Sequence, residues 1–324
     1  MPKRAAHPCE RNARSWPGSA VPRGGPRVWG AFRRFWTSTA DLRRGLALAL
    51  PGLALLPQVL SATWSVIAVD RATGRVVIAS ATCVPQGRFA GFPAAGLMDI
   101  QAIVVPGVGV AAAQAGVDAT RENQRLIHRE LKSGTAPEDI IRMLSTDPLV
   151  ERRQFGIVDL QGRCAGFSGS GNGAASLAVA DSVPGTGIVF SVQGNILASE
   201  DVVRDAVAAF KAAGPAGVNA LMDRVMAAME AADRAGGDRR CTCSTEPVPE
   251  APCEFRTSFV AYLLMAEPGD PEGDSYNDGD WSLYLNVTDE NLRPGEDANP
   301  VRTLRMRYDA WKAGTQPVEG GSSR

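Results

Sequence analysis

Residues Leu46–Leu56 read LALALPGLALL, and residues Thr63–Asp70 read TWSVIAVD, with Ser61–Ala62 just before the second segment. The apolar run is shorter than the roughly 20 residues that a membrane-spanning helix needs. It follows the positive pair Arg43–Arg44, as in a signal peptide. The second segment is rich in residues that favour strands. The stretch therefore predicts an export signal, a cleavage zone and the first strand of a folded domain.

Two cleavage positions remain open. A cut after Ser61 satisfies the small-residue rule better, but Ala62 would then need further trimming. A cut after Ala62 places the bulky Leu60 at the third position back, yet leaves Thr63 with a free α-amine. An N-terminal Thr holds a nucleophile and its base in one residue, because the neutral amine can take the hydroxyl proton. Thr63 is therefore a candidate nucleophile, the alternative being an ordinary strand residue.

The composition limits the classes of protein that the chain can represent. Of the 324 residues, we assign 1–62 to a leader and signal peptide, 63–314 to one domain, and 315–324 to a flexible tail. The net charge is −1 and the sequence contains no basic stripe, so nucleic acid is not an expected partner. We expect an exported protein, periplasmic or extracellular, that has no stable membrane span after cleavage.

Metal and cofactor sites are not expected from the His, Cys and acidic residues. With His7 in the leader, a His-based site would depend on His128 alone, which we interpret as a surface or packing residue. The carboxylates of residues 270–280 lack the EF-hand spacing and predict a solvated loop.

The number of cysteines predicts an unpaired thiol. If Cys9 leaves with the leader, five cysteines remain, so at least one is left over or pairs between chains. We expect a local disulfide that joins Cys253 to Cys241 or Cys243, since export permits disulfides.

The order of predicted elements indicates the fold class. Strands over 63–80 and 101–114 precede helices over 119–132 and 137–144, and strands over 155–193 precede helices over 199–213 and 216–235. Strands over 258–265 and 281–287 and a helix over 300–311 complete the chain. Because long βαβ alternation is absent, we predict an α+β fold, a four-layer αββα sandwich of two antiparallel sheets with helices outside.

Three segments carry a resemblance to a known family: Thr63–Ala68 (TWSVIA), Arg153–Asp159 (RQFGIVD) and Val192–Leu197 (VQGNIL). Together with Gly-rich turns in the same order, they resemble the family called domain of unknown function 1028, over about Thr63–Trp311. That family looks like N-terminal-nucleophile (Ntn) hydrolases of the proteasome type. The resemblance implies the αββα sandwich and puts Thr63 at the nucleophile position.

Other polar residues at strand ends and turns complete the candidate site. Ser168, Gly169 and Asn195 are candidate donors to an oxyanion, Asp238 and Arg239 would orient the site, and Ser80, Gln114 and Gln193 are candidate substrate-binding residues. The alternative for each is a polar residue that caps a strand end. No Lys or Arg lies between Arg88 and Arg121, so a cationic helper must come from elsewhere, and Arg239 is our candidate.

We therefore expect an exported Ntn-hydrolase-like amidohydrolase or peptidase that acts on a small amide or peptide substrate through Thr63. Two alternatives stay open: a non-catalytic extracytoplasmic ligand-binding protein on the same fold, and a structural or oligomerisation module. The missing cationic helper favours the binding protein over a strong enzyme. A homo-oligomer is also left open.

Overall fold

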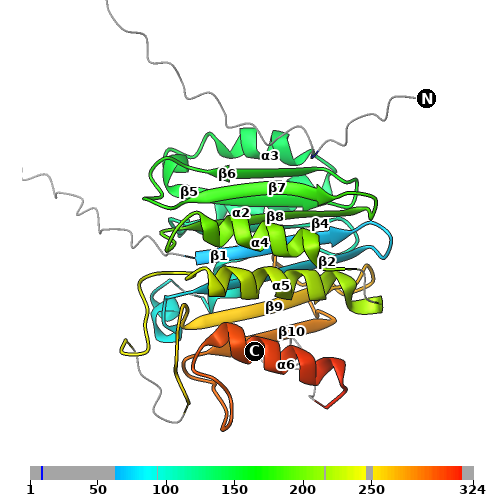
Figure 1. Cartoon of the computed structure of the whole chain (residues 1–324). Helices are drawn as coiled ribbons and strands as arrows, with labels where there is room; N and C mark the ends of the chain where they lie inside the picture. The colour runs from blue at the N-terminus through cyan, green and yellow to red at the C-terminus, as the bar shows by residue number, and fades with distance from the viewer. Residues whose placement is uncertain (1–8, 10–62, 93, 215–216, 246–250, 316–324) are drawn as a thin grey trace, which may run out of the picture. The chain divides into compact units, whose positions relative to one another are not determined.

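The structure, a computed structural model, describes Cys9 and residues 63–92, 94–214, 217–245 and 251–315 (Figure 1). Within these residues, the strands form two antiparallel sheets, and helices accompany both. The prediction of a mixed α+β fold is therefore confirmed. Apart from Cys9, the predicted leader, signal peptide and cleavage positions, and nearly all of the predicted tail, lie outside the described residues.

The larger sheet has β1 (Thr63–Asp70) near its centre. Its strand order is β10-β9-β2-β1-β8-β7, with β2 at Arg75–Thr82, β7 at Leu177–Val183, β8 at Ile188–Asn195, β9 at Val260–Ala266 and β10 at Leu283–Thr288. A tight turn joins β1 to β2, and Gly74 has the positive φ of 76° that this turn requires. Thr63 is paired on both sides, opposite Thr82 of β2 and Asn195 of β8.

The smaller sheet has the order β3-β4-β5-β6, with β3 at Ala102–Val105, β4 at Gly109–Ala115, β5 at Arg153–Asp159 and β6 at Cys164–Ser168. Val104 and Val105 of β3 are buried, although β3 is an edge strand of this sheet. The loop after β9 covers this edge, where the Val104 N–H donates to the Tyr276 carbonyl at 2.9 Å. A covered edge buries its side chains as a central strand would.

Alternation along β1 sends its side chains into two different cores. Trp64 and Val66 pack with the helices α4 (Asp201–Ala212) and α5 (Ala220–Arg234). Ile67 and Val69 instead join a core shared by both sheets. Thr63 and Ile67 are an even number of residues apart, so their side chains lie on the same face of β1, and Thr63 therefore faces the smaller sheet.

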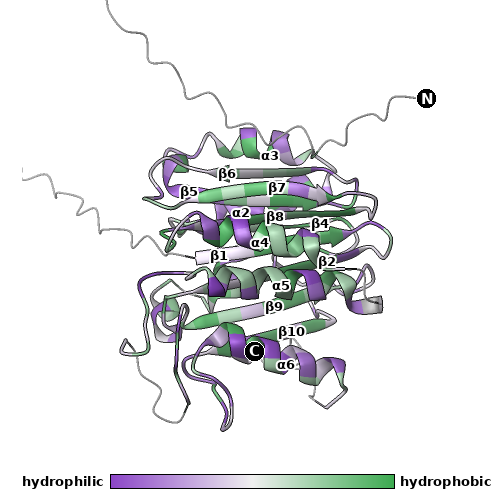
Figure 2. Ribbon diagram, viewed as in Figure 1, coloured by the Kyte–Doolittle hydropathy of each residue, from purple (hydrophilic) through white to green (hydrophobic). Residues whose placement is uncertain are grey.

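Helices complete the cores on the other sheet faces. The helix α6 (Pro300–Lys312) packs near β9 and β10, and α2 (Glu122–Lys132) and α3 (Pro137–Leu144) pack on the smaller sheet. Figure 2 shows both hydrophilic and hydrophobic residues along these helices, as expected for helices that pack on one side only. The chain between the strands predicted over 63–80 and 101–114 contains the short 3₁₀ helix η2 (Gln86–Gly91) and the helix α1 (Leu97–Gln101). Two more 3₁₀ turns are η3 (Val150–Arg152) and η4 (Gly217–Asn219).

The cysteines form three disulfides. Cys243 pairs with Cys253, which is one of the two local pairings that the sequence predicted. Cys83 pairs with Cys241, and Cys9 pairs with Cys164. None of the described cysteines is free. The prediction of a left-over thiol was made for a chain without Cys9, in which Cys164 would lose its partner, so the full chain does not test it. That count had set Cys9 aside with the leader, whereas here its side chain is buried against the domain.

Candidate functional site

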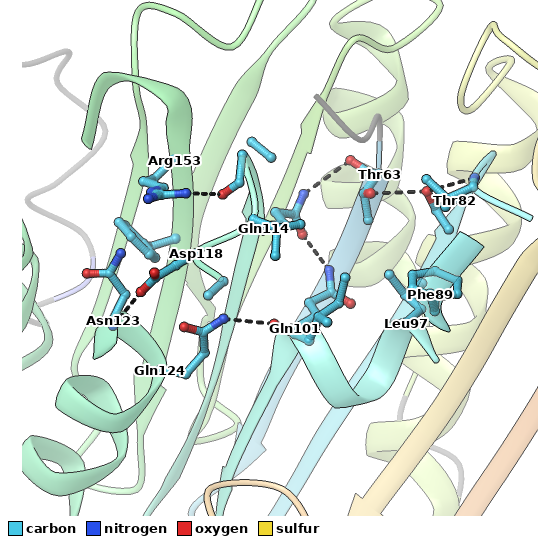
Figure 3. Close-up of a pocket in the computed structure, with 17 residues that line it drawn as sticks. Thr63, Thr82, Phe89, Leu97, Gln101, Gln114, Asp118, Asn123, Gln124 and Arg153 are labelled. Carbon is cyan, nitrogen blue, oxygen red and sulfur yellow. Dashed lines mark hydrogen bonds between the residues drawn. The ribbon is translucent and has the colours of Figure 1, made fainter. Parts of the chain in front are cut away.

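A pocket lies where the start of β1 meets the end of β4 (Figure 3). The space between its lining atoms, open solvent included, amounts to about 450 Å³. It reaches past the end of β4, from the space between the sheets toward α2. The polar residues that line it are Thr63, Thr82, Gln101, Gln114, Asp118, Asn123, Gln124 and Arg153, and the apolar ones include Phe89, Leu97 and Phe155.

Thr63 lies on one side of this pocket. Its side chain is almost fully buried, and its hydroxyl donates to Thr82 Oγ1 at 3.2 Å. The Thr63 carbonyl accepts a hydrogen bond from Gln114 Nε2 at 3.1 Å. Because β2 and β8 flank the strand, the surrounding backbone fixes where this hydroxyl points.

A buried network of glutamine side chains connects the pocket to the layer between the sheets. Gln114 is fully satisfied: its oxygen accepts from Ser65 Oγ at 2.6 Å and from Gln101 Nε2 at 2.7 Å, and its nitrogen donates to Thr63 and to Gln154 Oε1 at 2.8 Å. Gln193 Nε2 extends the network by donating to Ser65 Oγ at 2.6 Å. The predicted residues Gln114 and Gln193 thus belong to one network, but only Gln114 lines the pocket.

The network continues on both sides of Gln114. Tyr262 donates its hydroxyl to Gln101 Oε1 at 2.9 Å, and burial raises the pKa of this hydroxyl, so it remains a donor. Gln154 Nε2 reaches the Gly194 carbonyl of β8 and Ser168 Oγ, each at 2.9 Å. The polar groups between the sheets are therefore mostly neutral amides and hydroxyls that already have partners.

The opposite side of the pocket carries charge (Figure 3). Arg153 is buried, and its Nε donates to Asp147 at 2.8 Å and its Nη1 to the Gly116 carbonyl at 2.7 Å. Burial opposes ionisation of Asp118, but hydrogen bonds from Asn123 N and Thr120, together with the charge of Arg153, outweigh it and lower the pKa of Asp118. Both an anionic and a cationic side chain therefore face the pocket.

None of the three predicted oxyanion donors is among the residues that line the pocket, although two of them adjoin lining residues. Ser168 ends β6 and accepts from Gln154, while the Gly169 N–H donates to the Arg153 carbonyl at 3.0 Å. Asn195 is buried directly opposite Thr63 in the β1–β8 pairing. Ser80 is also buried, and its hydroxyl donates to the Trp64 carbonyl at 2.7 Å, which is a backbone-capping role.

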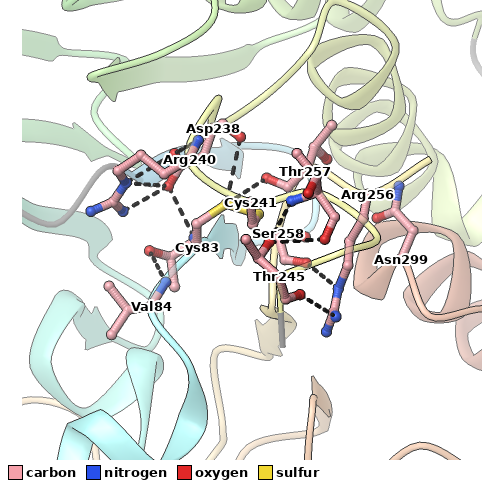
Figure 4. Close-up of a disulfide and its surroundings, with 12 residues drawn as sticks. Cys83, Val84, Asp238, Arg240, Cys241, Thr245, Arg256, Thr257, Ser258 and Asn299 are labelled. Atoms are coloured by element: carbon pink, nitrogen blue, oxygen red, sulfur yellow. Dashed lines mark hydrogen bonds and ion pairs between the residues drawn. A yellow bond between two sulfur atoms is a disulfide. The ribbon is translucent and has the colours of Figure 1, made fainter. Parts of the chain in front are cut away.

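Asp238 lies beside Cys83 and Arg240 (Figure 4). Its carboxylate accepts from the Cys83 backbone N–H at 3.0 Å, directly after Thr82. Arg240 forms an ion pair with Asp238, with Nη2 at 2.7 Å. The predicted Arg239 is exposed and is not among the residues that line the pocket. The carboxylate thus orients the strand end that holds the Thr63 hydroxyl's acceptor.

Sequence reasoning missed most of the charged side of the pocket. Asp118, Gln124 and Arg153 were not among the candidates, although Arg153 begins one of the segments that carried the family resemblance. Thr82, the last residue of β2, was not among the candidates either. Arg153 is a cation that lines the pocket, and β5 brings it beside Ala115 of β4.

Comparison with known proteins assigns the chain to a family. A model of a family of unknown function, DUF1028, matches residues 63–246. The chain belongs to the DUF1028 family. The match begins at Thr63 and includes every residue that lines the pocket, but ends before the strand β9, whereas we expected the resemblance to continue to Trp311.

A solved structure has a similar fold. The crystal structure of protein SPO2555 from Silicibacter pomeroyi, which matches the same DUF1028 model, aligns with a TM-score of 0.55 and 23% identity, covering 80% of this chain and 88% of that one. No curated protein matches the chain. Among the described residues, no helix is both long and apolar enough to cross a membrane.

Proposed function

We propose that this DUF1028 protein is an exported amide hydrolase of the N-terminal-nucleophile type, with the four-layer αββα arrangement of that class and with Thr63 as nucleophile. The observation that carries the proposal is the position of the Thr63 hydroxyl, which lines a pocket at the first residue of the central strand β1. An N-terminal nucleophile must be the first residue of the mature chain and must lie within reach of a substrate in the pocket. Cleavage just before Thr63 would meet the first condition.

The reaction would proceed through an ester of Thr63. The freed α-amine takes the hydroxyl proton while Oγ1 attacks the amide carbon. The carbon–nitrogen bond then breaks, and the leaving amine departs with that proton. Water, deprotonated by the same α-amine, hydrolyses the ester and restores the hydroxyl. The hydrogen bond to Thr82 holds Oγ1 in place before the attack.

A non-catalytic binding protein is the second candidate, and one observation favours it. The amides nearest Thr63 are engaged with one another, and the Gly169 N–H that we expected to stabilise an oxyanion is bound to Arg153. A hydrolase needs donors aimed at the developing negative charge. A pocket that only binds a ligand has no such requirement.

The experiment compares variants of the exported, processed protein on a panel of amides and peptides. Thr63→Ala should abolish hydrolysis while the melting temperature barely changes, and Thr63→Ser should retain part of the rate because it keeps both hydroxyl and amine. Thr73→Ala, in the exposed turn at the other end of β1, is the matched control and should keep full activity. Full activity of Thr63→Ala, or of a preparation in which peptide still precedes Thr63, would replace the hydrolase with the binding protein.

A further inference from the structure

The charged side of the pocket contains an acceptor without a donor. Gln124 is 2% exposed and lines the pocket. Its Nε2 donates to the Ile100 carbonyl at 2.9 Å, but its buried Oε1 has no partner among the described residues. An unsatisfied buried acceptor costs free energy, and a ligand that brings an N–H group would remove that cost.

Arg153 contributes a donor group that lacks an acceptor in the described part of the chain. A guanidinium has five N–H donors, and the described residues accept from two of its nitrogens, through Asp147 and the Gly116 carbonyl. The other terminal nitrogen has no acceptor among these residues. The side chain is 4% exposed and lines the pocket. A carboxylate would accept from such a group in a charge-assisted hydrogen bond.

Asp118 determines which kind of ligand the two groups can share. Its Oδ1 accepts from Thr120 and its Oδ2 from the Asn123 N–H at 3.0 Å, so Oδ2 keeps capacity for another donor. A simple anion at Arg153 would lie near the carboxylates of Asp118 and Asp147, and a simple cation at Asp118 would lie near the Arg153 guanidinium. A zwitterion gives each residue an opposite charge.

We propose that Arg153, Asp118 and Gln124 bind the head group of a free α-amino acid: its carboxylate at Arg153 and its ammonium at Asp118 and Gln124 Oε1. Figure 3 shows these three residues along the side of the pocket that faces Thr63 and Thr82. With both head groups held there, the ligand's side chain extends toward Thr63. The hydrolysed bond is then a side-chain amide, a conclusion that rests on the proposed function, whereas the binding does not.

The test is calorimetric titration of the full-chain Thr63→Ala protein, which cannot turn the ligand over, with L-asparagine and with L-glutamine. At least one should bind saturably. Its N-acetyl form and its α-methyl ester should each bind about tenfold or more weakly, since each loses a charge-assisted interaction. These blocked ligands test the proposal without any change to the pocket.

Variants locate the binding. Asp118→Asn and Arg153→Lys should each weaken binding by about tenfold or more, while Asp139→Asn and Arg142→Lys, which alter an exposed ion pair on α3, should not. Circular dichroism confirms that each variant is folded. Absence of saturable binding up to ~10 mM, or equal binding of the blocked forms, overturns the inference.

The two proposals fail separately. If the wild type hydrolyses other amides but neither amino acid binds, the head-group site is wrong and the hydrolase stands. If an amino acid binds as expected but the wild type hydrolyses nothing, the head-group site stands and the reaction at Thr63 is wrong.

Discussion

Replacing Gly156 with alanine should destabilise the protein by about 2–4 kcal/mol. A Cβ added at Gly156 would lie 2.2 Å from Gln193 Oε1, whereas non-bonded carbon atoms in contact are roughly 3.5–4.0 Å apart. The Gln193 amide would have to move by more than about 1 Å. It could not then keep its hydrogen bonds with Ser65 and Ser191, which measure 2.6 and 2.8 Å.

The magnitude follows from three contributions. Losing two buried hydrogen bonds costs about 1 kcal/mol each, and overpacking a filled interior costs about 1–3 kcal/mol. Exchanging Gly for Ala in a strand returns about 0.5–1 kcal/mol of backbone entropy. The net effect is a loss of about 2–4 kcal/mol, large for a domain whose total stability is about 5–15 kcal/mol.

Equilibrium denaturation by urea would measure the change. Gly91→Ala is the matched control, because a Cβ there meets nothing within 4 Å, and its free energy of unfolding should stay within about 0.5 kcal/mol of the wild type. In a double-mutant cycle, Gln193→Ala should remove much of the penalty of Gly156→Ala, since both act on the same amide. A cost below about 0.5 kcal/mol, or strict additivity of the two variants, would refute the reasoning.

Three further predictions concern stability. Val105→Asp should cost several kcal/mol in urea denaturation, because Val105 is buried and a carboxylate there has no partner; wild-type stability would show that β3 is misplaced. Burial disfavours ionised Glu296, but hydrogen bonds and charge from Arg307 prevail and hold its pKa below the ordinary 4.5. The ionised Glu296 carboxylate therefore contributes its full stabilisation above pH 4.5, and this contribution is lost as the pH falls through the lower folded-state pKa. Glu296→Gln should flatten the acid limb of the stability curve, and an unchanged limb would contradict this. Mass mapping of non-reduced protein should find Cys83–Cys241 and Cys243–Cys253 linked, and free thiols at these positions would contradict the pairing.

Local patterns were enough to predict much of the fold. The β1–β2 hairpin follows from apolar runs separated by a Gly-containing turn, and α3 begins and ends where its Pro and apolar spacing indicate. The short helix α1 was missed, because five residues after a Gly-rich loop carry too little periodicity. Tertiary packing stabilises such a helix, and sequence periodicity does not report on packing.

The candidate site was harder to predict, because it depends on pairings between distant segments. Thr63 and Gln114 could be singled out by their positions at strand ends. Arg153 could not, since only the register of β5 against β4 brings it to the pocket. The disulfide between Cys83 and Cys241 spans 158 residues, and sequence proximity had favoured local partners.

The glutamine network has a mechanical consequence. Apolar surfaces attract without a preferred direction, so two sheets held only by them could slide past each other at little cost. Gln114 reaches from β4 to the Thr63 carbonyl, and Gln154 from β5 to the Gly194 carbonyl of β8. Hydrogen bonds weaken steeply when stretched or bent, so the hydrogen bonds of these two side chains oppose sliding of one sheet past the other. A ligand that displaced Gln114 would therefore remove one of these two connections, so the sheets would shift more easily at the end where the pocket lies.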